Sequence, residues 1–163
     1  MRPLRILCGI PVVLTAAFFL LPLNATAAGA NLPSDLCSLL TPQQLQKTFG
    51  QPFGAPTKGS FPAPYMGMSE GTKCDYEQKG GHGGVTLIVY VDRSPAEAKQ
   101  NFDKLSMWFP PKSKPAGIGD SAYIDSNHAI HVLKGKVRYF ISINSNPSDK
   151  QTIDLAKSVA AQI

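Results

Sequence analysis

Two runs of alternating apolar and polar residues constrain what this chain can fold into more than any other feature. In the run 85–92, Val85, Leu87, Val89 and Val91 fall on one face of an extended strand. The run 137–144 repeats this pattern, with apolar residues at every second position. Both runs therefore predict strands that bury one face against a core.

Shorter runs and compact turns extend this sheet. A short strand around Tyr76 precedes the first run, and the segments 122–125 and 129–133 precede the second. Glycine-rich or Asx-containing turns join neighbouring runs, and short connections indicate antiparallel pairing. These turns are 80–84, 125–127 and 134–136.

Three segments carry the same signal for a helix start. Thr41, Ser94 and Ser148 each stand three residues before Gln or Glu, which predicts a capping box at each position. Apolar stripes follow at helical spacing, and each stripe must be buried, most simply by packing on a sheet. The predicted order is helix, two strands, helix, three strands, helix. We expect an α+β fold in which helices pack on an antiparallel sheet of about five strands.

The first 27 residues predict export. Arg2 and Arg5 precede the apolar run 6–23, and small residues at 25–27 complete the features of a signal peptide cleaved before Ala28. No stable membrane span is expected after cleavage. Cys8 stands at the start of the apolar run, which does not suit lipidation. The expected organisation is a signal peptide at 1–27, a short lead at 28–36 and one α+β domain at 37–163.

Export makes Cys37 and Cys74 expected disulfide partners, because disulfides persist in oxidising compartments. Redox-active pairs are usually separated by only two residues, so the wide spacing favours a structural bridge. The chain without its leader carries a net charge of about +3, with its lysines scattered. Nucleic-acid binding requires a basic stripe, which the sequence does not contain.

Short motifs along the chain resemble a group of exported bacterial envelope proteins that share a domain of unknown function. The motifs are Cys37-Ser-Leu-Leu-Thr41, Cys74-Asp-Tyr76 and Gly117-Ile-Gly-Asp120-Ser-Ala122, followed by a Lys134-Gly135 hairpin. The resemblance would cover residues 37–162. It implies a secreted or envelope protein and supplies no catalytic residue.

The segment 50–72 is rich in glycine and proline, yet it carries several large apolar side chains. Aromatic and methionine side chains on a loop suit a partner surface or an apolar ligand. The alternative is that they cap the core or an exposed sheet face. The candidate partner-binding residues are Phe53, Phe61, Tyr65, Met66 and Met68.

Signals for metal binding and catalysis are weak. His128 and His131 are expected on opposite faces of one strand, with His131 a satisfied, half-buried histidine, so neither a metal site nor a cofactor is expected. Asp120 and Asp125 resemble solvated turn residues. Ser121 beside Asp120 could serve a hydrolase only together with a histidine. Lys112 and Lys114 suit a solvated connector or contact with an anionic envelope polymer.

The sequence thus favours a secreted or periplasmic binding module of the bacterial envelope that acts without catalysis. Its partner would be an envelope protein or an apolar small ligand. Two alternatives stay open at this point, namely a hydrolase acting on an envelope substrate through Asp120 and Ser121, and an inhibitor of a secreted hydrolase.

Overall fold

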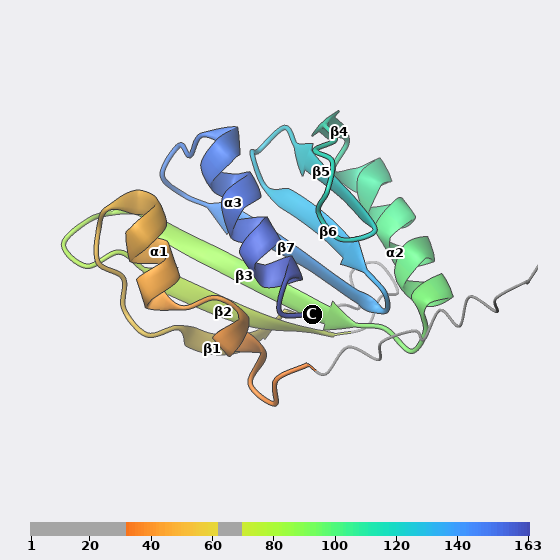
Figure 1. The fold of residues 1–163 in the computed structure, drawn as a ribbon, viewed down its shortest axis with the longest axis horizontal. Coiled ribbons are helices and arrows are strands. Elements are labelled where there is room, and N and C mark those ends of the chain that lie inside the picture. Colours follow the sequence, from red (N-terminus) through yellow and green to blue (C-terminus); the bar gives the residue numbers. More distant parts are fainter. Residues whose placement is uncertain (1–31, 62–69) are drawn as a thin grey trace, which may run out of the picture.

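The computed structural model describes residues 32–61 and 70–163. These residues form an α+β fold in which helices pack on one antiparallel sheet (Figure 1). The elements in chain order are η1 Leu36–Leu39, α1 Pro42–Phe49, β1 Thr57–Phe61, β2 Gly71–Glu77, β3 Gly84–Val91, α2 Pro95–Trp108, β4 Pro111–Ser113, β5 Ser121–Asp125, β6 Ile130–Lys134, β7 Val137–Ile143 and α3 Asp149–Ala160.

The described sheet has seven strands in the order β1-β2-β3-β7-β6-β5-β4, so the prediction of about five strands was too low. The two additional strands, β1 and β4, are the edges of the sheet. Every residue of β1 is exposed, and β4 has three exposed residues that begin with a proline. Neither segment carries the period-two alternation that a half-buried strand shows. Both connections 125–127 and 134–136 form the predicted hairpins.

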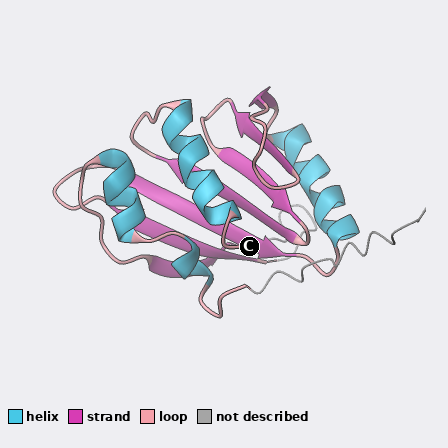
Figure 2. Ribbon diagram, in the orientation of Figure 1, coloured by secondary structure: helices cyan, strands magenta, loops and turns pink. Residues whose placement is uncertain are grey.

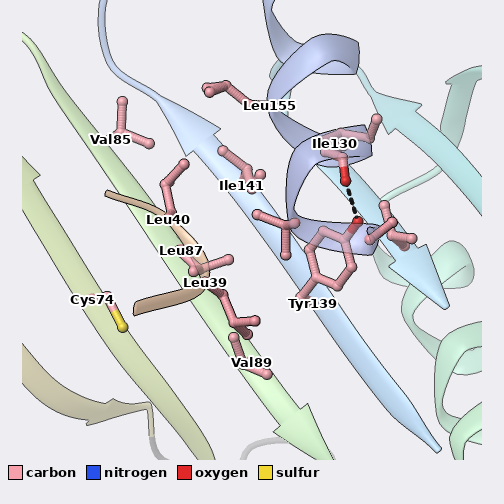
Figure 3. Packing of buried hydrophobic residues seen from close by; sticks show 14 of the residues in the cluster. Leu39, Leu40, Cys74, Val85, Leu87, Val89, Ile130, Tyr139, Ile141 and Leu155 are labelled. Carbon is pink, nitrogen blue, oxygen red and sulfur yellow. Dashed lines mark hydrogen bonds between the residues drawn. The ribbon is translucent and has the colours of Figure 1, made fainter. Parts of the chain in front are cut away.

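The main core lies between one face of the sheet and the helices η1, α1 and α3, which Figure 2 shows together in front of the strands. Alternate residues of β3 and β7 point into it, as their patterns predict. The buried residues Leu39, Leu87, Ile141 and Leu155 meet there (Figure 3). The hydroxyl of Tyr139 donates to the carbonyl of Ala156 at 2.6 Å and fixes α3 against the sheet.

The three α-helices begin directly after the predicted capping residues Thr41, Ser94 and Ser148. Complete capping boxes form at Thr41 and at Ser148, as predicted. At Ser94 the hydroxyl accepts from the amide of Glu97, but the Glu97 carboxylate turns to the amide and guanidinium of Arg93. The predicted box is therefore only half formed there, because a nearby cation competes for the carboxylate.

The predicted disulfide is present and joins η1 to β2 through Cys37 and Cys74. The buried hydroxyl of Tyr76, two residues further along β2, lies 2.6 Å from the carbonyl oxygen of Cys37 and 2.5 Å from that of Leu40. A covalent bond and a buried hydrogen bond thus attach the start of the domain to the sheet. The predicted leader and residues 28–31 of the lead segment lie outside the described residues. Within residues 32–61 and 70–163, no helix combines the length and apolar character needed to cross a bilayer.

Candidate functional site: an aromatic row on the second face of the sheet

Helix α2 covers part of the other face of the sheet. Ala98 and Phe102 of α2 pack against Tyr123 of β5 and Leu133 of β6 in a second, smaller apolar cluster. The helix runs along one side of this face, so the stripe predicted from its sequence does meet strands. Side chains of β1, β2 and β3 share this face with it through the pairing of the strands.

Five planar side chains form a continuous row on this face, which we call the aromatic row. Its members are Phe61, Phe109, Tyr123, His131 and Phe140. His131 is the centre, because its strand register places Tyr123 directly opposite on β5 and Phe140 directly opposite on β7. The imidazole stacks on Tyr123 with ring centroids 4.6 Å apart and on Phe140 at 5.4 Å.

The two ends of the aromatic row are the most accessible parts of it. Phe61 of β1 meets Phe140 edge-on, with centroids 6.4 Å apart. At the other end Phe109, directly after α2, stacks on His131 at 5.6 Å. Both Phe61 and Phe109 are exposed, whereas Tyr123 and His131 are buried. The row therefore connects two surface rings through a packed, buried middle.

His131 and Asp125 form a buried pair under this row. Nε2 of His131 lies 3.1 Å from Oδ2 of Asp125, and both side chains are almost fully enclosed. Oδ1 of Asp125 accepts from the amides of Asn127 and Ala129 at 2.8 and 3.0 Å. The prediction that Asp125 is a solvated turn residue is therefore wrong. Its carboxylate closes the β5–β6 turn from inside.

The pair has electrostatic consequences. Burial acts to raise the pKa of the Asp125 carboxyl, but hydrogen bonds from His131 and from the two amides outweigh burial and hold that pKa below its usual range. Burial raises the pKa of Tyr123. Nδ1 of His131 and the hydroxyl of Tyr123 have no hydrogen-bond partner among the described residues. His131 is therefore buried and not half-buried as predicted, and only one of its two ring nitrogens has a hydrogen-bond partner.

A second buried charge pair connects β3, β7 and α2. The Arg138 guanidinium binds both carboxylate oxygens of Asp92, with Nε 2.6 Å and Nη2 3.1 Å away. Asn101 of α2 donates to the same carboxylate at 2.8 Å. The guanidinium also lies over the ring of Tyr90, 4.6 Å from its centroid. Because Arg138 and Phe140 are two residues apart on β7, this pair lies on the same face as the aromatic row.

The structure separates the candidate partner-binding residues. Phe61 is 38% exposed and belongs to the aromatic row. Phe53 is only 7% exposed and packs in the main core beside Phe49, so its side chain has little surface to offer a partner. Tyr65, Met66 and Met68 lie outside the described residues. Residues 57–61, expected as part of an irregular loop, form the edge strand β1.

Neither His128 nor His131 pairs with Asp120 or Ser121, the other residues considered for catalysis. Asp120 is exposed and accepts from the amide of Gly135, which fixes the 117–120 turn to the β6–β7 hairpin. His131 pairs with Asp125 instead. His128 lies before β6, not on it, and its ring is 3.4 Å from Asp149. Within residues 32–61 and 70–163, no three His, Cys, Asp or Glu side chains are grouped to hold a metal ion.

An open groove of about 550 Å³ lies between α1 and α3, on the opposite side of the molecule from the aromatic row. Lys47, Thr48 and Gln151 line it together with Leu155 and Ser158, and the side-chain amide of Gln151 donates to the Thr48 carbonyl across it. This bond joins the two helices, so the groove is a packing seam between them.

Comparison with protein-family models, with curated proteins and with solved structures found no match for this chain. The function must therefore be argued from the geometry. Sequence reasoning found Phe61 but missed Phe140, Arg138 and Asp92. One signal was available in the sequence. The second face of the 85–92 and 137–144 strands, where polar residues would be expected in a half-buried strand, also carries the large apolar residues Ile88, Tyr90 and Phe140.

Proposed function

We propose that this protein is an exported, non-catalytic binding module of the bacterial envelope, and that its contact surface is the Phe61 end of the aromatic row. The observation that carries the proposal is the position of Phe61. Its ring is partly exposed, yet it is held edge-on against Phe140, which stacks on the buried His131. A surface ring with a rigid support loses little conformational entropy when it binds, which favours contact with an apolar partner.

The surroundings of Phe61 support a binding surface. The neighbouring positions of β1 and β2 on this face carry small or polar side chains, including Gly71 directly opposite Phe61. Lys73 and Asp75 follow on β2 and form an ion pair at 2.7 Å. Protein interfaces commonly have an apolar core and a polar rim. Phe61 would supply the apolar core, and the paired charges of Lys73 and Asp75 would belong to the rim. The partner expected is an envelope protein or an apolar small ligand.

Export is part of the proposal and has two supports. The sequence predicts a cleaved leader at 1–27, and the disulfide between Cys37 and Cys74 suits an oxidising compartment. Placement in the bacterial envelope rests on the resemblance of the motifs around Cys37, Cys74 and Asp120 to exported envelope proteins.

A non-catalytic role is supported by the enclosure of His131. A general base must reach the proton that it removes. The imidazole is covered by Tyr123, Phe140 and Phe109, and its free nitrogen is buried. The Asp125–His131 pair is better suited to fixing the aromatic row than to activating a substrate.

The proposal is tested by affinity capture from the envelope fraction of the parent organism with wild type, Phe61→Ser and Val91→Ser. Val91 is a matched control, because it is exposed to the same degree on another strand end. We expect a specific envelope component that the wild type and Val91→Ser retain and Phe61→Ser loses, with melting temperatures nearly unchanged. Equal retention by all three proteins would contradict the proposed surface. A hydrolytic activity lost in Ser121→Ala would instead favour the enzyme alternative.

A further inference from the structure

The C-terminal end of α2 exposes a compact apolar group. Met107 is 73% exposed and Trp108 is 63% exposed, and Phe109 beside them is also exposed. Leu105, two residues before this group, is buried and anchors the end of the helix on the sheet. Met107 and Trp108 therefore project from a firmly packed element, while Phe109, which stacks on His131, remains partly exposed beside them. We call Met107, Trp108 and Phe109 the apolar tip.

Three lysines flank the apolar tip in the sequence. Lys104 precedes it by one helical turn, and Lys112 and Lys114 follow Trp108 by four and six residues along and just beyond β4. Figure 1 shows the end of α2 and β4 at the same end of the sheet. None of the three lysines forms an ion pair with a residue that the structure describes. The nearest carboxylate on the helix, Asp103, is bound by Lys99 at 2.6 Å.

We propose that the apolar tip and its lysines dock the protein on the surface of an anionic lipid bilayer. Tryptophan combines an apolar ring system with a polar N–H group, which suits the boundary between headgroups and acyl chains. Each lysine near an anionic surface adds attraction to the lipid headgroups. The binding is peripheral, because a short helix end inserts side chains and does not span the bilayer.

The size of the apolar tip favours lipid over a protein partner. A stable protein interface requires about 800 Å² from each side, whereas the apolar tip comprises only three side chains, flanked in the sequence by lysines. Interfacial insertion requires only a few apolar side chains when cationic residues contribute. The apolar tip shares Phe109 with the aromatic row but does not include its Phe61 end. Membrane docking therefore goes beyond the proposed binding function, and either one can fail without the other.

Trp108 makes the test direct, because it is the only tryptophan in the chain. The exported protein is titrated with vesicles of phosphatidylcholine containing phosphatidylglycerol, and Trp108 emission is recorded. We expect a shift to shorter wavelength with the anionic vesicles and a much smaller one with phosphatidylcholine alone. Added salt weakens the response, since it screens the lysines. An unchanged emission spectrum with anionic vesicles would overturn the proposal.

Two charge-matched variants locate the surface. Lys112→Gln with Lys114→Gln should weaken binding to the anionic vesicles by roughly tenfold or more. Lys79→Gln with Lys136→Gln removes the same charge from turns elsewhere, and it should weaken binding far less. Equal loss in both would mean that only net charge matters and would contradict the assigned surface.

A third arm separates lipid from a soluble anionic polymer. Dextran sulfate carries negative charge without an apolar phase, so it should not move the emission of Trp108. A shift of equal size with dextran sulfate would overturn the lipid assignment in favour of polymer binding. Met107→Ser keeps every lysine and should weaken vesicle binding by about tenfold through lost apolar insertion. Vesicle binding that is unaffected by Met107→Ser would also contradict docking through the apolar tip.

Discussion

His131 and Asp125 form a buried pair in which Nε2 of the imidazole lies 3.1 Å from Oδ2 of the carboxylate. The carboxylate also accepts two amide hydrogen bonds from its own turn, so it fixes the β5–β6 hairpin and the tilt of the imidazole together. Because Tyr123 and Phe140 stack on that imidazole, the pair determines the position of the aromatic row and, through Phe140, supports the ring of Phe61.

This pair predicts acid sensitivity. The pKa of Asp125 lies below its usual value of 3.8, so the folded protein binds fewer protons than the unfolded chain near that pH. The stability that Asp125 contributes is present above about pH 4 and is lost as pH falls through the folded pKa. Urea unfolding between pH 3 and 6 should show this loss. Asp125→Asn should be less stable at neutral pH, and its free energy of unfolding should fall less steeply as the pH is lowered (the acid limb of the profile).

Asp103→Asn is the control for this measurement, because Asp103 is exposed on α2 and outside the buried pair. It should follow the wild-type acid profile. An acid limb in Asp125→Asn as steep as that of the wild type would show that the pair does not carry the pH dependence.

The Asp92–Arg138 pair predicts a strong asymmetry between single and double substitutions. Arg138→Met leaves the Asp92 carboxylate buried without its guanidinium and should lower the free energy of unfolding by about 3–5 kcal/mol. The double variant with Asp92→Leu removes both charges, so its loss should be smaller than the sum of the two single losses. A double-mutant cycle in urea measures this. Strict additivity would contradict the coupling, and Arg93→Met, at an exposed ion pair, should change stability little.

The disulfide predicts a large effect of reduction. Cys37 and Cys74 are 37 residues apart in sequence, and in the loop-entropy model closing a loop of this length contributes about 4 kcal/mol by restricting the unfolded chain. Urea unfolding with and without reductant should therefore differ in midpoint, and Cys37→Ala with Cys74→Ala should resemble the reduced protein. Identical midpoints, with both thiols shown to be free by mass spectrometry, would contradict this contribution.

Phe53 and Phe61 are predicted to respond in opposite ways. Phe53→Ala opens the core beside Phe49 and should cost about 3–5 kcal/mol. Phe61→Ala removes a half-exposed ring with one edge-on contact, so its cost should be about 1 kcal/mol or less. Thermal or urea unfolding compares the two variants directly. A large loss in Phe61→Ala would assign Phe61 to the core and remove it from the proposed surface.

The sequence predicted the parts of the fold that depend on local chemistry. The period-two patterns of Val85–Val91 and Val137–Ile143 indicated strands with one core face, and Thr41 and Ser148 marked helix starts that the structure confirms. The disulfide followed from the expected compartment. The edge strands β1 and β4 were missed, because an edge strand with exposed side chains requires no apolar alternation.

The candidate site was harder to predict, because it depends on contacts between distant segments. Alternation placed His131 on the same strand face as Leu133, but it could not show that Phe109 would cover that face. Asp125 resembled a solvated turn residue because its local sequence is turn-like. Its burial arises from a side chain six residues away on the next strand. Phe53 and Phe61 look alike in sequence, and only the three-dimensional packing separates them.

Site-specific photo-crosslinking in intact cells of the parent organism tests the central proposal most directly. A photoreactive amino acid is placed at position 61 in one protein and at position 91 in another, and the adducts are identified by mass spectrometry. We expect a specific adduct with an envelope component from position 61 that position 91 does not form. The same adducts from both positions, or none from position 61, would contradict a partner surface at the Phe61 end of the aromatic row.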